Sequence, residues 1–576
     1  MFVRIRNSFL SNVTTRLYKG DLKMKKFKIV SLTLVTTIIC NALIGCKINL
    51  NDKIHKLKDA SPITLTLFIS EDLGEAKFDD AVAGKIKELT GVNLEIICAD
   101  SSFSKPIDLM IAKEDYPDLI YAKGDTSKLI DARAIIKLDD YFEEKGENLK
   151  NLYGDQIKRL RYSLEDQSIY TVGASGVSSA QWNPNGTMQL QHRVLKELGY
   201  PKINTIYDYE EALKRYIEKY PETNGEKTIG LSLMASDWRW LITVGNIASS
   251  VAGIPDDGQF KIDDESQKAT YKFQLPEVKE YIKWLNHLNA EGLLDPESFT
   301  QDDSTYRGKL DRGVVLGISD AKWGYESSMK NLINNGNEEA TFAPLPVTIN
   351  EIYKDQSLKD YGFSGGNGIG ISKSCENKER AFEFLDWLAS DEAQVLLNWG
   401  IEGVHYKIEN GKRIFLPEIE KQKNTDNSFA FNTGVGKYSN YFPQRGDGAL
   451  DSTGNYYTTN SIENYENAYN SAEKETLKAY GVNSWVDLFP EAEELGVSKH
   501  GQQWQYIIPT DSDMAIIQNR LDEYTQKSIT EVILGPESQF DDSWNKIQEE
   551  MKKMGVEQLN DDMSKMTVEK IKLWNE

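Results

Sequence analysis

The sequence predicts an α/β fold built on mostly parallel sheets, and three observations carry this prediction. Short β-rich runs typical of strands occur at 63–70 (ITLTLFIS), 92–99 (VNLEIICA) and 118–122 (DLIYA). A helical pattern at 79–91 (DDAVAGKIKELTG) separates the first two runs, and strands that alternate with helices indicate βαβ units. The length of 576 residues allows two or more such domains.

Helical signals recur later in the chain. Asp208 and Glu211 resemble a capping box, Pro276 suits the first turn of a helix, and Asn377 is a candidate cap. A further helix is indicated by an apolar stripe at helical spacing, formed by Phe540, Trp544, Ile547 and Met551. Such stripes are most simply the faces that helices turn toward a core.

Charge and residue counts exclude several classes of function. The formal net charge is −22, and the first 45 residues carry eight basic side chains and one acidic, so the remainder is still more acidic. A chain this acidic repels nucleic acid, and we expect no nucleic-acid partner. No metal-ligand spacing links the five histidines with the four cysteines, which are Cys40, Cys46, Cys98 and Cys375. We therefore expect no metal site, no cofactor and no catalytic residues.

The segment from Met24 reads MKKFKIVSLTLVTTIICNALIGC and has the features of a secretory leader. Three lysines precede the 16 uncharged residues 29–44, which fall short of the roughly 20 that span a bilayer. The last four letters, LIGC, resemble a bacterial lipobox. We expect a lipoprotein signal peptide at 24–45 and acylation of Cys46, which would anchor the mature chain to the outer face of the membrane.

Two segments flank this leader. Residues 1–23 form a polar preface that signal peptides rarely carry, and we expect translation to start at Met24 instead. Residues 46–61 are polar without a clear period and are expected to be a flexible tether. The alternative interpretation of the leader is an uncleaved anchor helix in which the cysteine is incidental.

The body of the chain resembles bacterial extracellular solute-binding proteins. The resemblance lies in DYPDLI at 115–120, in QWNPNGTMQLQHRVLKELGYPKINTIYDYEEAL at 181–213 and in GFSGGNGIGISKSCENKERAFEFLDWLASDEAQ at 362–394. Within this family, the resemblance is to the large lipoproteins that serve carbohydrate importers of the ATP-binding-cassette (ABC) type, as indicated by WGIEGVHYKIENGK at 399–412. It covers roughly 62–576 and depends on the order of the motifs, since no single one is specific.

The resemblance implies a two-lobed periplasmic-binding-protein fold of class II type, with each lobe discontinuous in sequence. We expect lobe one at 62–178 plus 312–360 and lobe two at 179–311 plus 361–576. The implied function is capture of an oligosaccharide in the cleft between the lobes and delivery to an ABC permease, by a monomer without enzymatic activity. The alternatives are an anchored carbohydrate-active enzyme and a peptide-binding or sensory component of the same fold.

A sugar site needs aromatic platforms for C–H faces and polar side chains for hydroxyls. Trp323 is the leading candidate because it follows a strand-like run and precedes a helix, where α/β folds build sites. The lesser candidates are Asp320, Tyr325, Trp182, Asn183, Trp238, Trp240, Asn367 and Trp399.

Each of these candidates has a plainer interpretation. Trp182 is as well explained as a packed hinge residue. One of Trp238 and Trp240 is expected to be buried unless the segment is extended, in which case both would face the same side. Asn367 lies in a glycine-rich stretch that suits a close approach of two backbones.

Overall fold

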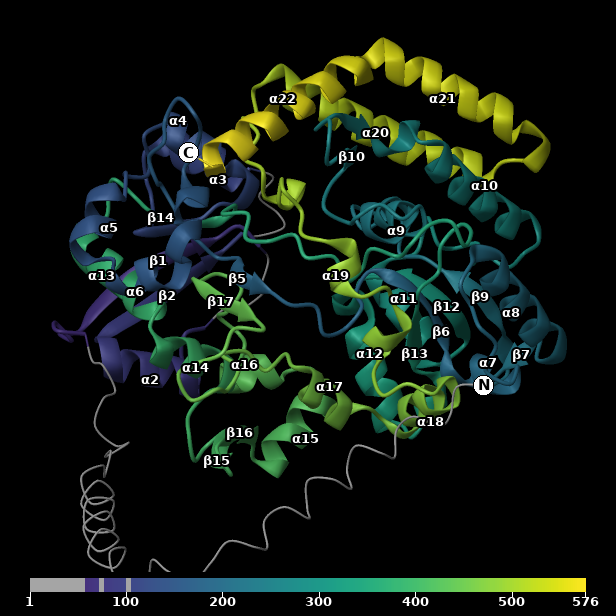
Figure 1. Cartoon of the computed structure of the whole chain (residues 1–576), viewed down its shortest axis with the longest axis horizontal. Helices are drawn as coiled ribbons and strands as arrows, with labels where there is room; N and C mark the ends of the chain where they lie inside the picture. Colours follow the sequence, from purple (N-terminus) through teal and green to yellow (C-terminus); the bar gives the residue numbers. More distant parts are fainter. Residues whose placement is uncertain (1–56, 72–76, 100–104, 576) are drawn as a thin grey trace, which may run out of the picture. The chain divides into compact units, whose positions relative to one another are not determined.

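The computed structural model describes residues 57–71, 77–99 and 105–575, all within one compact unit, Lys56–Glu576 (Figure 1). The predicted signal peptide, the start at Met24, the acylated Cys46 and most of the tether lie outside the described residues. None of the helices in the described part is long and apolar enough to cross a membrane.

The first sheet has five strands and forms near the start of the described chain. Its order is β2 (Val92–Cys98), β1 (Ile63–Ile69), β3 (Leu119–Tyr121), β14 (Gly368–Ile371), β4 (Val172–Gly173). β1 runs parallel to β2 and β3, whereas β14 is antiparallel to both of its neighbours, β3 and β4. The strands predicted at 63–70, 92–99 and 118–122 are therefore confirmed.

Helices from two distant parts of the chain cover this sheet (Figure 1). They are α2 (Ala81–Thr90), α3 (Pro106–Lys113), α4 (Thr126–Asp131), α5 (Asp139–Lys145), α6 (Glu147–Tyr153), α13 (Lys378–Leu388) and α14 (Asp391–Trp399). α13 packs on α5, α6 and β14, and Phe382 and Leu385 enter the same core as Leu67 and Ile86. The predicted helix at 79–91 is α2, which begins after Asp80, whose side chain accepts the Ala83 N–H.

The second sheet has four strands, in the order β13 (Phe342–Leu345), β6 (Thr187–Gln191), β12 (Val315–Asp320), β9 (Ile229–Ser232). β12 is parallel to β9, and β6 is antiparallel to both β12 and β13. The helices around it are α7 (His192–Glu197), α8 (Ile206–Lys219), α9 (Ile247–Val251), α10 (Pro276–Ala290), α11 (Asp303–Asp311) and α12 (Lys322–Asn334). Each sheet is thus mostly parallel with one reversed strand.

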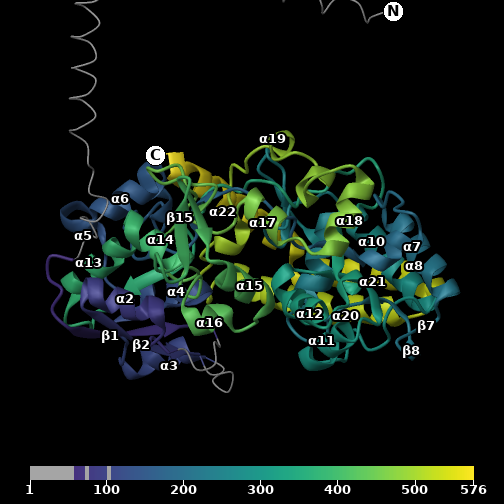
Figure 2. The ribbon, with the colours of Figure 1, turned by 90° about the horizontal axis from the view of Figure 1, so that it is seen from below.

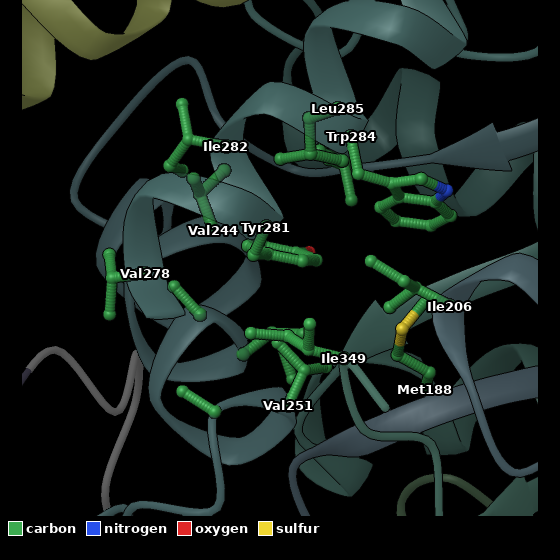
Figure 3. Close-up of a cluster of buried hydrophobic side chains, with 14 of the residues drawn as sticks. Met188, Ile206, Val244, Val251, Val278, Tyr281, Ile282, Trp284, Leu285 and Ile349 are labelled. Atoms are coloured by element: carbon green, nitrogen blue, oxygen red, sulfur yellow. The ribbon is translucent and has the colours of Figure 1, made fainter. Parts of the chain in front are cut away.

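Figure 3 shows the core that α10 builds beside this sheet. Tyr281, Ile282 and Leu285 of α10 are fully buried, together with Val244 and Met188. Burial of such side chains contributes about 1.5–3 kcal/mol each to stability. The helix predicted to open at Pro276 does so, because proline needs no partner for its missing N–H in a first turn.

Two predicted helix starts differ in detail. The capping box of α8 is formed by Thr205 and Asp208, so the helix begins earlier than the Asp208–Glu211 pattern predicts. Asn377 does precede α13, but its side chain makes no capping hydrogen bond. Both differences follow from the backbone conformation of the preceding loop, which residue type alone does not determine.

The C-terminal third adds small elements and a helical hairpin. They are β15 (Tyr406–Glu409), β16 (Lys412–Phe415), α15 (Pro417–Thr425), α16 (Phe429–Thr433), β17 (Gln444–Asp447), α17 (Ile462–Ala468), α18 (Ser471–Tyr480), α19 (Ala492–Leu495), α20 (Asp513–Leu534), α21 (Phe540–Met554) and α22 (Val556–Asn575). The predicted stripe on α21 is buried in the same core as α10.

The division into lobes needs a correction. Segment 312–360, expected in lobe one, supplies β12 and β13 to the second sheet, while β14, α13 and α14, expected in lobe two, belong with the first. The chain therefore crosses after β4, returns only after β13, and contributes its last helices to the second core. The error arose because strand partners are long-range choices that local periodicity does not reveal.

Candidate functional site

The carboxyl edge of each sheet lies where the chain crosses from one sheet to the other. In the first sheet β1, β3 and β4 end where the reversed β14 begins, so Asn367 lies at their carboxyl edge. In the second sheet β9 and β12 end where β6 begins, and β13 ends at the same edge. The segments 174–186 and 346–367 each join these two edges. Ligands of α/β sheets bind outside the carboxyl ends of strands, so the site is expected between them.

Trp238 and Trp323 form an exposed stacked pair at the carboxyl edge of the second sheet. Their ring centroids lie 5.9 Å apart with an interplanar angle of 16°. Trp238 is 64% exposed and Trp323 49% exposed, although most other tryptophans of the chain are buried. Two large adjoining rings left in solvent are an apolar platform of the kind that stacks on a ligand.

The loop that carries Trp238 is held by charge pairs on its polar side. The Asp237 carboxylate accepts the Arg239 N–H at 2.8 Å, and the Arg239 guanidinium pairs with Asp303 at 2.5 Å. Arg307 pairs with the same Asp303 carboxylate at 2.8 Å. The Asp237 carbonyl accepts the Gln526 side-chain amide of α20 at 3.2 Å. The ring is therefore exposed on a fixed loop.

The turn that carries Trp323 rests on a buried carboxyl group. Asp320 is inaccessible to solvent, and its side chain accepts the Ala321 N–H at 2.8 Å and the Tyr306 hydroxyl at 3.1 Å. Burial raises the pKa of Asp320 to about 7. A Cβ on Gly324 would lie 2.5 Å from this carboxylate, so the turn requires glycine there. Asp320 therefore positions the first turn of α12, rather than facing a ligand as predicted.

Two of the predicted platforms are core residues instead. Trp240 is 3% exposed and packs against Phe273, and Trp399 is equally buried against Phe415 with its indole N–H donated to the Tyr456 carbonyl. Trp238 and Trp240 do not face the same side, because the segment turns into a helix there. Neither buried ring can stack on a ligand in this conformation, which corrects both predictions.

The remaining candidates lie close to the crossings. Trp182 is half-buried with its ring 6.0 Å from that of Tyr456, and Asn367 is half-buried with its backbone N–H donated to Gln505. Asn183 and Tyr325 line a hollow beside α12. Of the predicted residues, the structure thus brings Asn183, Trp323 and Tyr325 together around the start of α12, with Trp238 stacked beside them.

Three hollows lie along the facing edges. The edge hollow, of about 440 Å³, lies between Ser70 and Ala122–Asp125 on one side and segment 506–519 on the other. The crossing hollow, of about 320 Å³, is lined by Ser175–Ser179 of the first crossing, by Tyr361 of the second and by β17. The α12 hollow, of about 800 Å³, lies beside α12.

The crossing hollow and the α12 hollow adjoin, since both are lined by Asn398, Ser439, Thr458 and Asn460. Their shared wall consists of neutral hydrogen-bonding side chains. Asn460 donates its side-chain amide to the Asp447 carboxylate at 3.1 Å. Walls of this kind suit a ligand with many hydroxyl groups better than an apolar one.

Sequence reasoning missed the polar residues of β17 and the segment after it. β17 pairs in parallel with β5 (Gly176–Ser179), and Gly446 sits opposite Ser178 with a φ of 84°. A Cβ on Gly446 would lie 1.9 Å from the Ser178 carbonyl oxygen, so the approach of the two strands requires glycine. The QRGDG letters at 444–448 were the available signal, but their partner lies far away in the sequence.

Acidic groups in the described residues do not assemble into a metal site. No group of three or more His, Cys, Asp or Glu side chains within residues 57–71, 77–99 and 105–575 is placed to hold a metal ion. Two of the acidic residues cap helices instead: Asp80 caps α2 and Asp302 caps α11. Cys375 has a buried thiol whose pKa burial raises to about 11.

Comparison with known proteins adds an independent finding. Residues 81–398 match the profile of the family described as bacterial extracellular solute-binding protein, which is more than half of the chain. The lipoprotein LipO of Bacillus subtilis (strain 168) is 23% identical over 371 residues, covering 62% of this chain and 69% of LipO. The fructooligosaccharide ABC transporter substrate-binding protein FusA of Streptococcus pneumoniae serotype 4 is 23% identical over 339 residues, covering 55% of this chain and 59% of FusA.

Solved structures share the fold. FusA of Streptococcus pneumoniae in complex with kestose has a TM-score of 0.64 at 19% identity, covering 88% of this chain and 99% of that one. The alginate-binding protein AlgQ2 has a TM-score of 0.61 at 17% identity, covering 89% and 99%. At such identities the likeness speaks for the fold alone.

Proposed function

The chain belongs to the bacterial extracellular solute-binding protein family, and from this premise we propose that it captures an oligosaccharide and delivers it to an ABC importer. The observation that carries the proposal is the stacked, exposed pair of Trp238 and Trp323 at the carboxyl edge of the second sheet. The family is one of solute binders, so binding without turnover is expected.

The chemistry of the site supports a sugar. Pyranose and furanose rings have apolar C–H faces that stack on aromatic rings, and their hydroxyls need donors and acceptors at fixed positions. The tryptophan pair offers aromatic rings for stacking. The amide and hydroxyl side chains shared by the crossing and α12 hollows offer hydrogen-bond donors and acceptors. Two of the similar proteins, FusA and AlgQ2, are named for a carbohydrate, which points the same way.

Delivery requires a change that a permease can recognise. The two crossings and β17 are the connections across which the sheets could close on a ligand, and a ligand that touches both edges binds the closed form better. Acylation of Cys46 would hold the protein at the membrane and raise its effective concentration near the permease. Mass spectrometry of the N-terminal peptide from the native host tests the anchor: an unmodified Cys46 still joined to Gly45 would refute it.

The binding test uses the tryptophan pair. Mature protein from Cys46 onward is screened by thermal shift against plant and microbial oligosaccharides, since a ligand that binds only the folded state raises its stability. We expect at least one glycan to bind, and Trp238→Ala or Trp323→Ala to weaken it about tenfold or more, equivalent to about 1.4 kcal/mol.

Tyr207→Ala is the matched control, because Tyr207 is 54% exposed on α8 and lines none of the three hollows. Its affinity should equal that of the wild type. A peptide that stabilises the protein while no glycan does would replace the sugar proposal with the peptide-binding alternative. Equal affinity of the wild type and both tryptophan variants would remove the stacked pair from the site.

A further inference from the structure

The α12 hollow is formed where the two halves of the described chain meet. α15 packs on α12, and the views in Figures 1 and 2 place the two helices near each other. Asn334 at the end of α12 donates its side-chain amide to the Thr425 carbonyl of α15 at 2.9 Å. α15 is joined to the first core through Ile419, whereas α12 follows β12 of the second sheet.

Three lysines line this hollow, and two of them have no carboxylate within ion-pair distance among the described residues. Lys322 and Lys330 come from α12, and Lys423 comes from α15. Among the residues that the structure describes, Lys423 has no carboxylate within ion-pair distance; its ammonium lies 5.5 Å from the centroid of the Phe415 ring. Lys322 lies 5.0 Å from the Tyr465 ring centroid, and Lys330 is 3.9 Å from Glu326.

Lys423 is half-buried, so its ammonium is partly shielded from water. Burial lowers the pKa of Lys423 to about 8, and the neighbouring Lys322 and Lys330 push in the same direction, while Glu326 and Glu420 oppose them. A partly desolvated ammonium without a close counter-ion disfavours the folded protein, and an anion placed beside it would offset that cost.

Four carboxylates line the same hollow, and three of them are engaged in local hydrogen bonds. Glu338 accepts the Ser471 N–H at 2.9 Å, and Asp426 accepts the Ser428 N–H at 2.8 Å. Glu473 accepts the Asn470 N–H at 2.9 Å and the Trp485 indole N–H at 3.2 Å. These three acids thus serve to cap local turns, and the fourth, Glu326, lies 3.9 Å from Lys330. Among the described residues, neither Lys423 nor Lys322 has a carboxylate within ion-pair distance, and both line the hollow.

We propose that the α12 hollow takes an anionic unit of the carbohydrate ligand, a sugar carboxylate or sulfate ester, with Lys423 and Lys322 as its charge partners. This proposal rests on the proposed function and names the class of sugar. Lys322 and Trp323 are consecutive in the first turn of α12, so a glycan stacked on the tryptophan pair lies beside the hollow. Tyr465 and Asn183 would contact the ring that carries the charge.

The test compares monosaccharides that differ in charge. The apparent affinities of D-glucose, D-glucuronate and D-glucose 6-sulfate are measured by thermal-shift titration at constant ionic strength, with inorganic sulfate as the ionic baseline. We expect the charged sugars to stabilise the protein more than glucose or inorganic sulfate does. The ratio between the two charged sugars identifies whether carboxylate or sulfate ester is preferred.

Lys423→Met provides the site-specific arm. It should weaken the charged sugars about tenfold or more and leave the response to glucose unchanged. Lys421→Met, an exposed lysine on the same helix, should leave both responses unchanged. Because the substitution removes an unneutralised charge, the ligand-free Lys423→Met protein should melt no lower than the wild type, which excludes misfolding as the cause of lost binding.

Two outcomes would overturn the proposal. The first is that charged sugars do not exceed the glucose and sulfate baselines in the wild-type protein, and the second is that their excess persists in Lys423→Met. If a neutral oligosaccharide nevertheless binds through Trp238 and Trp323, the proposed function stands and only the anionic preference falls. If no carbohydrate of either kind binds, both proposals fail together.

Discussion

Asp320 links a buried carboxyl group to an exposed aromatic ring. Its side chain has no access to solvent, yet it closes the turn in which Trp323 begins α12. Arg239 and Arg307 lower the pKa of this carboxyl group, but burial outweighs them and leaves it raised to about 7. Tyr306 and Tyr325 are the other titratable groups that face it. The state of one buried proton therefore bears on the turn that presents the platform.

Asp320→Asn should become more stabilising, relative to the wild type, as pH rises from 5 to 8. The pKa of Asp320 in the folded protein, about 7, exceeds the ordinary value of 3.8. Its neutral carboxyl group therefore contributes fully to the free energy of unfolding below pH 4, and this contribution is lost as pH rises through 7. The asparagine retains an acceptor for the Ala321 N–H and does not ionise. Thermal unfolding at several pH values measures the difference.

Asp302→Asn is the control for this titration. The Asp302 side chain caps α11, and its hydrogen bonds with Thr305 lower its pKa below 3.8. It is ionised in both folded and unfolded states across pH 5 to 8, so the effect of its substitution should not vary over that range. If the effect of Asp320→Asn on stability is equally independent of pH, the raised pKa of Asp320 is contradicted.

At the scale of elements, the pairing of β5 with β17 connects the crossing to a distant part of the chain. Gln444 and Gly446 pair with Gly176 and Ser178, and the Gln444 side-chain amide donates to the Ala174 carbonyl at 2.8 Å. This short ladder lines the crossing hollow. It joins the first crossing to the segment that leads on to Asn460, and it is a candidate hinge for closure.

Gly446→Ala should disrupt this ladder. The added methyl group would collide with the Ser178 carbonyl oxygen, and backbone cannot yield as a flexible side chain would. Gly454→Ala is matched to it, because Gly454 also has a positive φ, 78°, but open space around its Cβ. The control isolates the strain of the left-handed backbone, which costs about 1–2 kcal/mol.

We expect Gly446→Ala to lose more unfolding free energy than Gly454→Ala, as measured by denaturant titration, and also to weaken glycan binding. Equal losses for the two variants would mean that the close approach of β5 and β17 does not persist in solution. Unchanged glycan affinity in a destabilised Gly446→Ala protein would separate the ladder from the binding site.

At the scale of the molecule, the edges that hold the three hollows are joined by crossings that run between two separately packed cores. The first core includes Leu67 and Phe382, and the second includes Tyr281 and Trp544. Close-packed cores resist deformation, so a change of shape on binding is expected to concentrate in the crossings.

Small-angle X-ray scattering should therefore record a smaller radius of gyration when the tightest glycan from the thermal-shift screen is added. Trp238→Ala at the same glycan concentration should show a smaller change, because less of it is liganded. A radius that stays constant while calorimetry reports saturation would argue against closure, and hence against recognition of a closed form by the permease.

The sequence alone determined the local elements and the family likeness. β1, α2, β2 and the start of α10 were predictable because a strand or helix is encoded by neighbours within a few residues. The place of Trp323 at a strand-to-helix junction made it the leading candidate for the site. The order of short motifs along 62–576 was enough to indicate a solute-binding protein.

The tertiary structure decided which segments pair and which aromatic rings remain exposed. Trp238 and Trp240 have the same residue type two positions apart, yet one is 64% exposed and the other 3%, because burial depends on partners such as Phe273 that come from elsewhere in the chain. The same physical reason explains the misplaced segment 312–360 and the unforeseen cation-lined hollow. Pairing and burial are sums over contacts between distant residues, and local sequence records only one side of each contact.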